Sequence, residues 1–148
     1  MRKLVFTAFL FMCFALIVPN ADAQQPYNHF ALEHLKKSLE FLILGDYHNA
    51  VLSSNQLIRY DPNSAINYVI RARAYYEMKN YDMTIADCTH AIRIDRNNSA
   101  AFVIRGNAHG QKGDLNRAIS DWEAALRINP NIDEAIHNIA LARQNRGH

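Results

Sequence analysis

AINYVIRARAYYEMKNYDMTIADCTHAIRIDRNN, residues 65–98, aligns without a gap with SAAFVIRGNAHGQKGDLNRAISDWEAALRINPNI, residues 99–132. The preceding stretch, ALEHLKKSLEFLILGDYHNAVLSSNQLIRYDPNS, residues 31–64, extends the same alignment at the same spacing. Self-similarity at a period of about 34 residues indicates a repeat architecture, in which each unit buries its apolar face against its neighbours. The structure of one repeat is therefore expected to occur three times along the chain.

The three stretches share their small and apolar residues column by column. Small side chains predict places where two helix backbones approach closely, and the larger apolar columns recur at the three- and four-residue spacing of amphipathic helices. The mainly small columns are Ser38, Ala72 and Gly106; Ala50, Thr84 and Ala118; and Leu57, Ala91 and Ala125. The larger columns include Tyr47, Tyr81 and Leu115, and Val51, Ile85 and Ile119.

Turn-forming residues also repeat. Gly or Asn suits the left-handed residue that ends a helix, and Pro or Asn suits the entry to the next one. The mid-repeat pairs are Gly45-Asp46, Lys79-Asn80 and Gly113-Asp114, and the repeat ends are Asp61-Pro62-Asn63, Asp95-Arg96-Asn97 and Asn129-Pro130-Asn131. Each repeat is predicted to be a helix, a tight turn, a second helix and a short turn.

This register resembles the tetratricopeptide repeat (TPR) family, whose small-residue, aromatic and terminal Pro columns match those above. The resemblance implies an all-α fold, a right-handed superhelical stack of helix-turn-helix hairpins. Lys79 in place of the turn Gly and Arg96 in place of Pro depart from the family pattern, and the first repeat is the loosest. The expected segments are an N-terminal segment 24–30, repeats 31–64, 65–98 and 99–132, and a capping helix with tail 133–148.

Residues 1–23 have the layout of a secretory signal peptide. Arg2 and Lys3 precede an apolar run, residues 4–18, and the small-residue signature Ala21-Asp22-Ala23 follows, so cleavage is expected after Ala23. The alternative is an uncleaved anchor, but the run falls short of the ~20 apolar residues that cross a bilayer core. The mature chain is expected in the bacterial periplasm or secreted, without stable membrane insertion.

Charge and reactive residues exclude several classes of function. Sixteen Lys and Arg against fourteen Asp and Glu leave a formal net charge of +2 without a basic stripe, which argues against nucleic-acid binding. Cys88 would be the one cysteine left after cleavage, and it is expected to be a small buried residue. No two His or Cys have the helical spacing of a metal site, and no phosphate loop or nucleophile elbow is present. The chain is therefore predicted to be no enzyme and to need no cofactor or metal.

One charged pattern also recurs at the repeat period. Arg71 and Asp87 lie sixteen positions apart and occupy the same columns as Arg105 and Asp121. In a helical hairpin these positions face each other, so two structural ion pairs are predicted. Because the pair follows the repeat, a structural role is favoured over a substrate clamp.

The resemblance also implies that the first helices of successive repeats line a groove for a partner. The groove is expected to be mostly apolar, and its polar side chains are expected to be Arg73, Asn107 and Gln111. Its predicted residues are Leu32, Leu35, Leu39, Leu42, Ile66, Val69, Ile70, Arg73, Tyr76, Val103, Ile104, Asn107 and Gln111. The family's carboxylate clamp is absent, because its matching positions hold Leu35, Leu39, Ile70, Ala100 and Ile104.

An exported interaction scaffold or adaptor is the function that these features favour. Its groove would bind an apolar or amphipathic segment of another protein or peptide. Two alternatives stay open: a self-associating structural protein that forms a homodimer through the apolar groove, and an accessory subunit of an exported enzyme.

Overall fold

The computed structural model describes the backbone of residues 21–144 and the side chains of residues 29–144. The chain divides into two units, residues 1–33 and residues 34–148. The described part of the first unit is helical and belongs to α2 (Ala21–Leu44). Most of the predicted signal peptide, residues 1–20, and the tail 145–148 lie outside the described residues. Among the helices that are described, none combines the length and the apolar character that a bilayer crossing requires.

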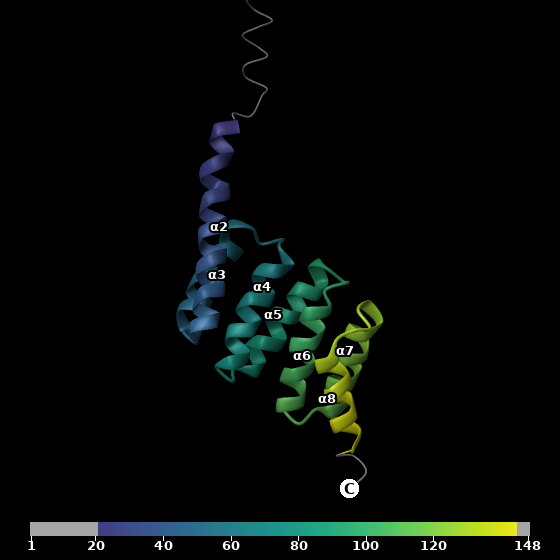
Figure 1. The fold of residues 1–148 in the computed structure, drawn as a ribbon. Helices are drawn as coiled ribbons and strands as arrows, with labels where there is room; N and C mark the ends of the chain where they lie inside the picture. The colour runs from purple at the N-terminus through teal and green to yellow at the C-terminus, as the bar shows by residue number, and fades with distance from the viewer. Residues whose placement is uncertain (1–20, 145–148) are drawn as a thin grey trace, which may run out of the picture. The chain divides into compact units, whose positions relative to one another are not determined.

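The second unit is a stack of helical hairpins, as predicted from the repeats. All elements described between residues 34 and 144 are α-helices, and consecutive helices lie side by side (Figure 1). After α2 they are α3 (Tyr47–Tyr60), α4 (Ala65–Glu77), α5 (Tyr81–Ile94), α6 (Ser99–Gln111), α7 (Leu115–Ile128) and α8 (Asp133–Gln144). One boundary differs from the prediction: α2 begins at Ala21 rather than at Ala31, so segment 24–30 is helical.

The tight turn within each hairpin is built from a left-handed residue followed by a helix cap. Gly45 and Gly113 have φ values of 76° and 81°, and Lys79 adopts the same conformation with φ 59°. A side chain with a Cβ in this region is strained by about 1 kcal/mol. The following residues cap the next helix by accepting a backbone hydrogen bond: Asp46 from Asn49 (3.2 Å), Asn80 from Met83 (3.3 Å) and Asp114 from Arg117 (3.1 Å).

The turns between repeats share one hydrogen bond. In each of them a side-chain oxygen accepts from the backbone N–H two residues later, which closes the turn locally. The bonds join Asp61 to Asn63 (3.0 Å), Asp95 to Asn97 (3.0 Å) and Asn129 to Asn131 (3.1 Å). Arg96 stands where the other two turns have Pro, and the turn around it keeps this bond. The Asx contact, rather than the proline, is therefore the common element.

The small columns lie where the two helices of a hairpin meet. Ala72, Ala50, Thr84 and Ala118 have no exposed surface, and Leu57 is only 3% exposed. Gly106 shows why a small residue is needed there, because a Cβ on it would lie 2.7 Å from Nε1 of Trp122. Close packing of backbones at these positions forces the large side chains to either side of the contact, where they form the core.

Both predicted ion pairs are formed, and each is bidentate. Nε and Nη2 of Arg71 donate to the two Asp87 oxygens at 2.8 and 2.7 Å, and Arg105 donates to Asp121 at 2.9 and 2.8 Å. These hydrogen bonds raise the pKa of each arginine, against the opposing effect of burial. The pairs are structural, since their carboxylates are buried between helices.

Each arginine also reaches the preceding repeat. Nη1 of Arg71 donates to Oδ1 of Asn55 on α3 (2.7 Å), and Nη1 of Arg105 donates to Oγ1 of Thr89 on α5 (3.1 Å). Asn55 and Thr89 occupy the same column of the repeat. One guanidinium thus joins the second helix of its own hairpin to the second helix of the hairpin before it.

Replacing Asp121 with Ala is expected to lower the free energy of unfolding by about 3 kcal/mol, because it leaves Arg105 half-buried without its partner. Urea unfolding followed by circular dichroism measures this loss. The matched control is Glu123→Ala on the same helix, which breaks the exposed pair with Arg143. That change is expected to cost about 0.5 kcal/mol or less. Equal losses in the two variants would show that the Arg105–Asp121 pair is not structural.

Candidate functional site

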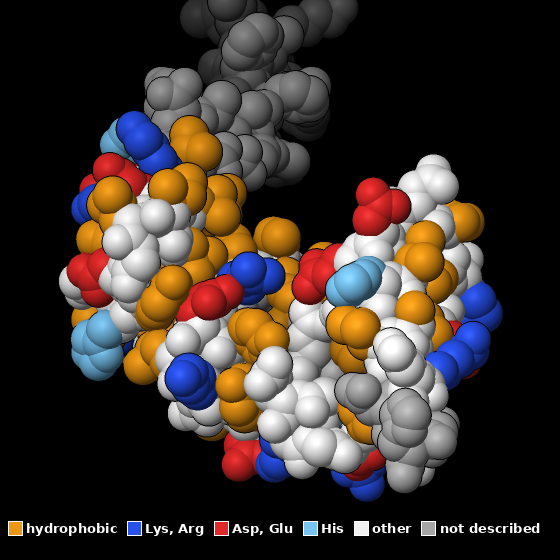
Figure 2. Space-filling model, turned by 60° about the horizontal axis from the view of Figure 1, so that its bottom comes forward, with side chains coloured by type: hydrophobic (Ala, Val, Ile, Leu, Met, Phe, Trp, Pro, Cys, Tyr) orange, Lys and Arg blue, Asp and Glu red, His pale blue; other side chains and the backbone are white. Residues whose placement is uncertain are grey.

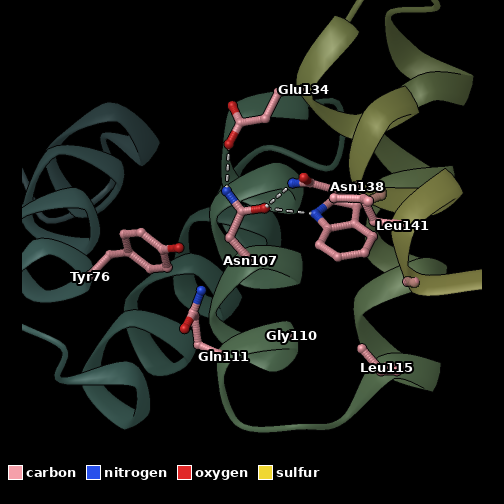
Figure 3. Close-up of a pocket in the computed structure, with 10 residues that line it drawn as sticks. Tyr76, Asn107, Gly110, Gln111, Leu115, Glu134, Asn138 and Leu141 are labelled. Carbon is pink, nitrogen blue, oxygen red and sulfur yellow. Dashed lines mark hydrogen bonds between the residues drawn. The ribbon is translucent and has the colours of Figure 1, made fainter. Parts of the chain in front are cut away.

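A pocket of about 330 Å³ opens between α4, α6, α7 and α8 (Figure 3). Its lining combines amide, phenol and carboxylate groups with an apolar wall. The residues are Tyr76, Asn107, Gly110, Gln111, Leu115, Trp122, Glu134, Asn138, Leu141 and Ala142. Glu134 is the one side chain of a charged type among them, so the formal charge of the lining is negative.

Asn107 organises the polar side of this pocket. Its Oδ1 accepts from Nε1 of Trp122 (2.9 Å) and from Nδ2 of Asn138 (3.0 Å), and its Nδ2 donates to Oε1 of Glu134 (2.7 Å) (Figure 3). Because these contacts use both ends of the amide, they determine its orientation. Asn107 is 8% exposed, and it holds α7 and α8 against α6. One oxygen of the Glu134 carboxylate is thereby held at Asn107, and the other points away from it (Figure 3).

The repeat register extends this pocket into a continuous surface. If the first residue of each repeat is position 1, Glu134 is at position 2, Asn107 and Leu141 are at position 9 and Gln111 is at position 13. The same three positions on α2, α4, α6 and α8 of the second unit define what we call the inner face. Its members are Leu39, Ile43, Ile66, Arg73, Glu77, Ala100, Asn107, Gln111, Glu134 and Leu141.

The inner face changes character along the stack. Toward α2 and α4 it is apolar and open to solvent, with Leu39 43%, Ile43 85% and Ile66 51% exposed. Figure 2 shows hydrophobic side chains gathered on this side of a hollowed surface, with charged side chains among them. In the middle Arg73 and Glu77 pair with each other at 2.9 Å. The opposite end, at α6 and α8, carries the amides and the carboxylate of the pocket. The inner face is therefore apolar at one end and polar at the other.

Four of the predicted groove residues lie in the core instead. Val69, Ile70, Val103 and Ile104 are between 4% and 8% exposed, and this corrects their assignment to an open groove surface. Val69 and Val103, at position 5 of the first helices, pack against the first helix of the next repeat, whereas Ile104, at position 6, packs in the cluster of the preceding repeat. Val69 belongs to one cluster with Ala101 and Ile104 of α6, and Val103 belongs to another with Ala135 and Ile139 of α8.

The remaining predicted residues divide by exposure. Leu39, Ile66, Arg73 and Gln111 are exposed, and Tyr76 is half-buried and lines the pocket. Leu35 and Leu42 are also half-buried, and Leu42 packs against the cluster of Ala50, Val51 and Ala74. Leu32 is 64% exposed but belongs to the first unit, so it is not assigned to the inner face. Asn107 lines the pocket, although its side chain is buried within the Trp122, Asn138 and Glu134 contacts.

Sequence reasoning missed the contribution of α8. Treating this helix only as a cap overlooked Glu134, Asn138 and Leu141, all of which line the pocket. A signal was available: moving one repeat length onward from Ala100 and Asn107 leads to Glu134 and Leu141. The helix therefore serves both as the end of the stack and as a wall of the site.

The lining of the site contains amide, phenol, carboxylate and indole groups, all of which can form hydrogen bonds. Burial raises the pKa of the Tyr76 hydroxyl, and a hydrogen bond with Gln111 lowers it by less. Outside the pocket, burial raises the pKa of the Cys88 thiol to about 12, so this cysteine is protonated and unreactive at neutral pH. Burial also lowers the pKa of His109. No group of three or more His, Cys, Asp or Glu in the described residues is placed to hold a metal ion.

The fold defines the class of helical-repeat proteins built from stacked helical hairpins. Tetratricopeptide repeat models match residues 65–98 and 99–132, the same bounds as two of the predicted repeats. The second TPR of Spaghetti (RPAP3), bound to the HSP90 peptide SRMEEVD, is 32% identical over 73% of this chain and 99% of that one, with a TM-score of 0.67. The chain belongs to the tetratricopeptide repeat family.

Two further solved structures are similar over a larger share of the chain. The first TPR of Spaghetti (RPAP3), also bound to SRMEEVD, is 26% identical over 81% of this chain and 95% of that one, with a TM-score of 0.78. The second TPR domain of human RPAP3, in complex with the HSP70 peptide SGPTIEEVD, is 29% identical over 79% and 98%, with a TM-score of 0.74. Comparison with curated proteins gives no match.

Two glycines beside Trp122 are expected to respond oppositely to replacement by Ala. At Gly106 the new Cβ would lie 2.7 Å from Nε1 of Trp122, so the ring must shift and its bond to Asn107 is lost. A loss of about 1 to 3 kcal/mol of unfolding free energy is expected. At Gly110 the nearest ring atom is 3.5 Å away, an ordinary contact. Gly110 is the next-to-last residue of α6, so Ala is expected to stabilise by about 0.5 kcal/mol or less, below the value for a helix interior.

Urea unfolding followed by tryptophan fluorescence measures both variants, because Trp122 is the one tryptophan of the chain. Destabilisation by Gly110→Ala, or tolerance of Gly106→Ala, would contradict this account of the packing around the ring.

Proposed function

We propose that this protein is an exported interaction scaffold that binds an apolar or amphipathic segment of another protein along its inner face. The observation that carries the proposal is the exposure of three large aliphatic side chains of the inner face, Leu39, Ile43 and Ile66. When a partner removes aliphatic surface of this kind from water, the complex is stabilised by roughly 25 cal/mol per Å². The solved relatives that hold peptides support a polypeptide as the ligand.

The inner face suits a segment that is apolar at one end and polar at the other. Its apolar end offers Leu39 and Ile66, while its polar end offers Asn107, Gln111 and Glu134. A helix or an extended peptide with unequal ends would bury apolar side chains first and then satisfy its polar groups at the pocket. Such a surface favours one direction of binding over the other.

Selection of random dodecapeptides displayed on phage is expected to give peptides rich in Leu, Ile or Phe that bind the isolated protein. Changing Leu39 and Ile66 together to Glu is expected to abolish this binding while leaving the helical circular dichroism spectrum intact, because both residues are already exposed. Fluorescence anisotropy with the synthetic peptide measures the affinity.

The matched control changes two similarly exposed apolar residues on second helices, Leu52 and Met83, to Glu. Neither lies on the inner face, so the control is expected to bind as the wild type does. Failure to select any peptide, or equal weakening by both pairs of changes, would refute the groove proposal. A stable dimer in light scattering, dissociated by Leu39→Glu with Ile66→Glu, would instead favour self-association.

The exported location rests on the pattern of residues 1–23. When the full chain is produced in a bacterial host, we expect the periplasmic fraction to contain a protein that begins at Gln24. Intact-mass spectrometry and N-terminal sequencing measure this. Recovery of a chain that keeps Met1–Ala23, or its confinement to the cytoplasm, would contradict export with cleavage.

A further inference from the structure

The charge of the pocket distinguishes one end of the inner face. Glu134 supplies the one charge of its lining, and Asn107 holds Oε1 of this carboxylate at 2.7 Å. In the described part of the chain, Oε2 of Glu134 has no hydrogen-bond partner. The nearest cation along the inner face, Arg73, is paired with Glu77 at 2.9 Å. Although Arg73 and Glu134 line one neighbouring pocket, they form no ion pair.

Acceptor oxygens accompany this carboxylate. Asn138 donates its Nδ2 to Asn107, so its Oδ1 stays available as an acceptor. The Gln111 amide lies across the pocket beside Tyr76 (Figure 3). A cation with several N–H donors could therefore bond to a carboxylate and to neutral amide oxygens together, the arrangement that lysine and arginine heads require.

The remaining lining is apolar and suits a hydrocarbon stem. Trp122, Leu115 and Leu141 surround the space next to the polar group, and Gly110 leaves the edge of the indole ring uncovered. Lys and Arg bury their methylene groups against such surfaces while the charged head reaches a polar site. At about 330 Å³ the pocket lies at the small end of ligand sites, so it suits a single side chain.

We infer that this pocket binds one lysine or arginine side chain of the partner segment, with the charged head at Glu134 and Asn138 and the stem against Trp122 and Leu141. This inference rests on the proposed function and adds the partner's chemistry to it: an apolar segment followed by a basic residue. The peptides in the solved relatives, SRMEEVD and SGPTIEEVD, end in acidic residues. Such an end would meet like charge in this pocket.

The test uses the peptide selected on the full protein, synthesised with an acetylated N-terminus and an amidated C-terminus so that its ends carry no charge. Its basic residue is replaced by norleucine, and Glu134 of the protein is replaced by Gln. Gln keeps an acceptor for Asn107 but removes the charge. Each single change is expected to weaken binding about tenfold, and the two together no more than one alone. Trp122 fluorescence is expected to respond to the lysine or arginine peptide and less to the norleucine peptide.

The possible outcomes distinguish failure of the pocket assignment from failure of the groove proposal. Selected peptides without a basic residue, or equal affinity of wild type and Glu134→Gln, would overturn the pocket assignment while the effect of Leu39→Glu with Ile66→Glu still supports groove binding. Additive losses from the two single changes would also overturn it, because the two groups would then act independently. Absence of any selected peptide would overturn both proposals.

Discussion

The close approach of the two helices in each hairpin is the constraint on which the rest of the structure depends. It requires a small residue at each crossing, as the 2.7 Å separation between a Cβ at Gly106 and the Trp122 ring makes plain. With the backbones this close, Arg71 and Arg105 can reach carboxylates on the facing helices. Hydrophobic burial has no preferred direction, so it does not by itself determine the relative orientation of the helices. A bidentate Arg–carboxylate pair has a defined geometry and restricts that orientation.

This packing decides which side chains are available to a partner. Val69 and Val103, at position 5 of the first helices, turn toward the following repeat, and the residues at positions 2, 9 and 13 lie on the inner face. Most residues of the inner face are therefore exposed and can vary without loss of the fold, whereas Asn107 is buried and also holds α7 and α8 against α6. Here that freedom has produced an apolar end around Leu39 and Ile66 and an acidic, amide-rich end around Glu134.

Most of the fold could be predicted because the residues that determine helices and turns recur in each repeat. The positions of the turns and the Arg71–Asp87 pairing follow from columns that recur from one repeat to the next, whereas the start of α2 at Ala21 lies outside the repeat pattern. The site was harder to predict because the apolar periodicity of one helix does not show which of its side chains a neighbouring helix will bury. Val69 and Val103 are predicted as exposed groove residues, but the following first helix buries them. Glu134 is not among the predicted groove residues, because its helix is expected only to cap the stack.

The sequence by itself determined that the chain is a stack of helical hairpins, where the turns between the helices of the repeats fall, and that two ion pairs join the helices. These properties depend on residues close together in the sequence or related by the repeat. Only the tertiary structure decided that Asn107 brings Trp122, Asn138 and Glu134 together and which aliphatic side chains remain in solvent. Burial and convergent hydrogen bonds depend on neighbours from three different helices, and their relative placement arises only when the repeats pack.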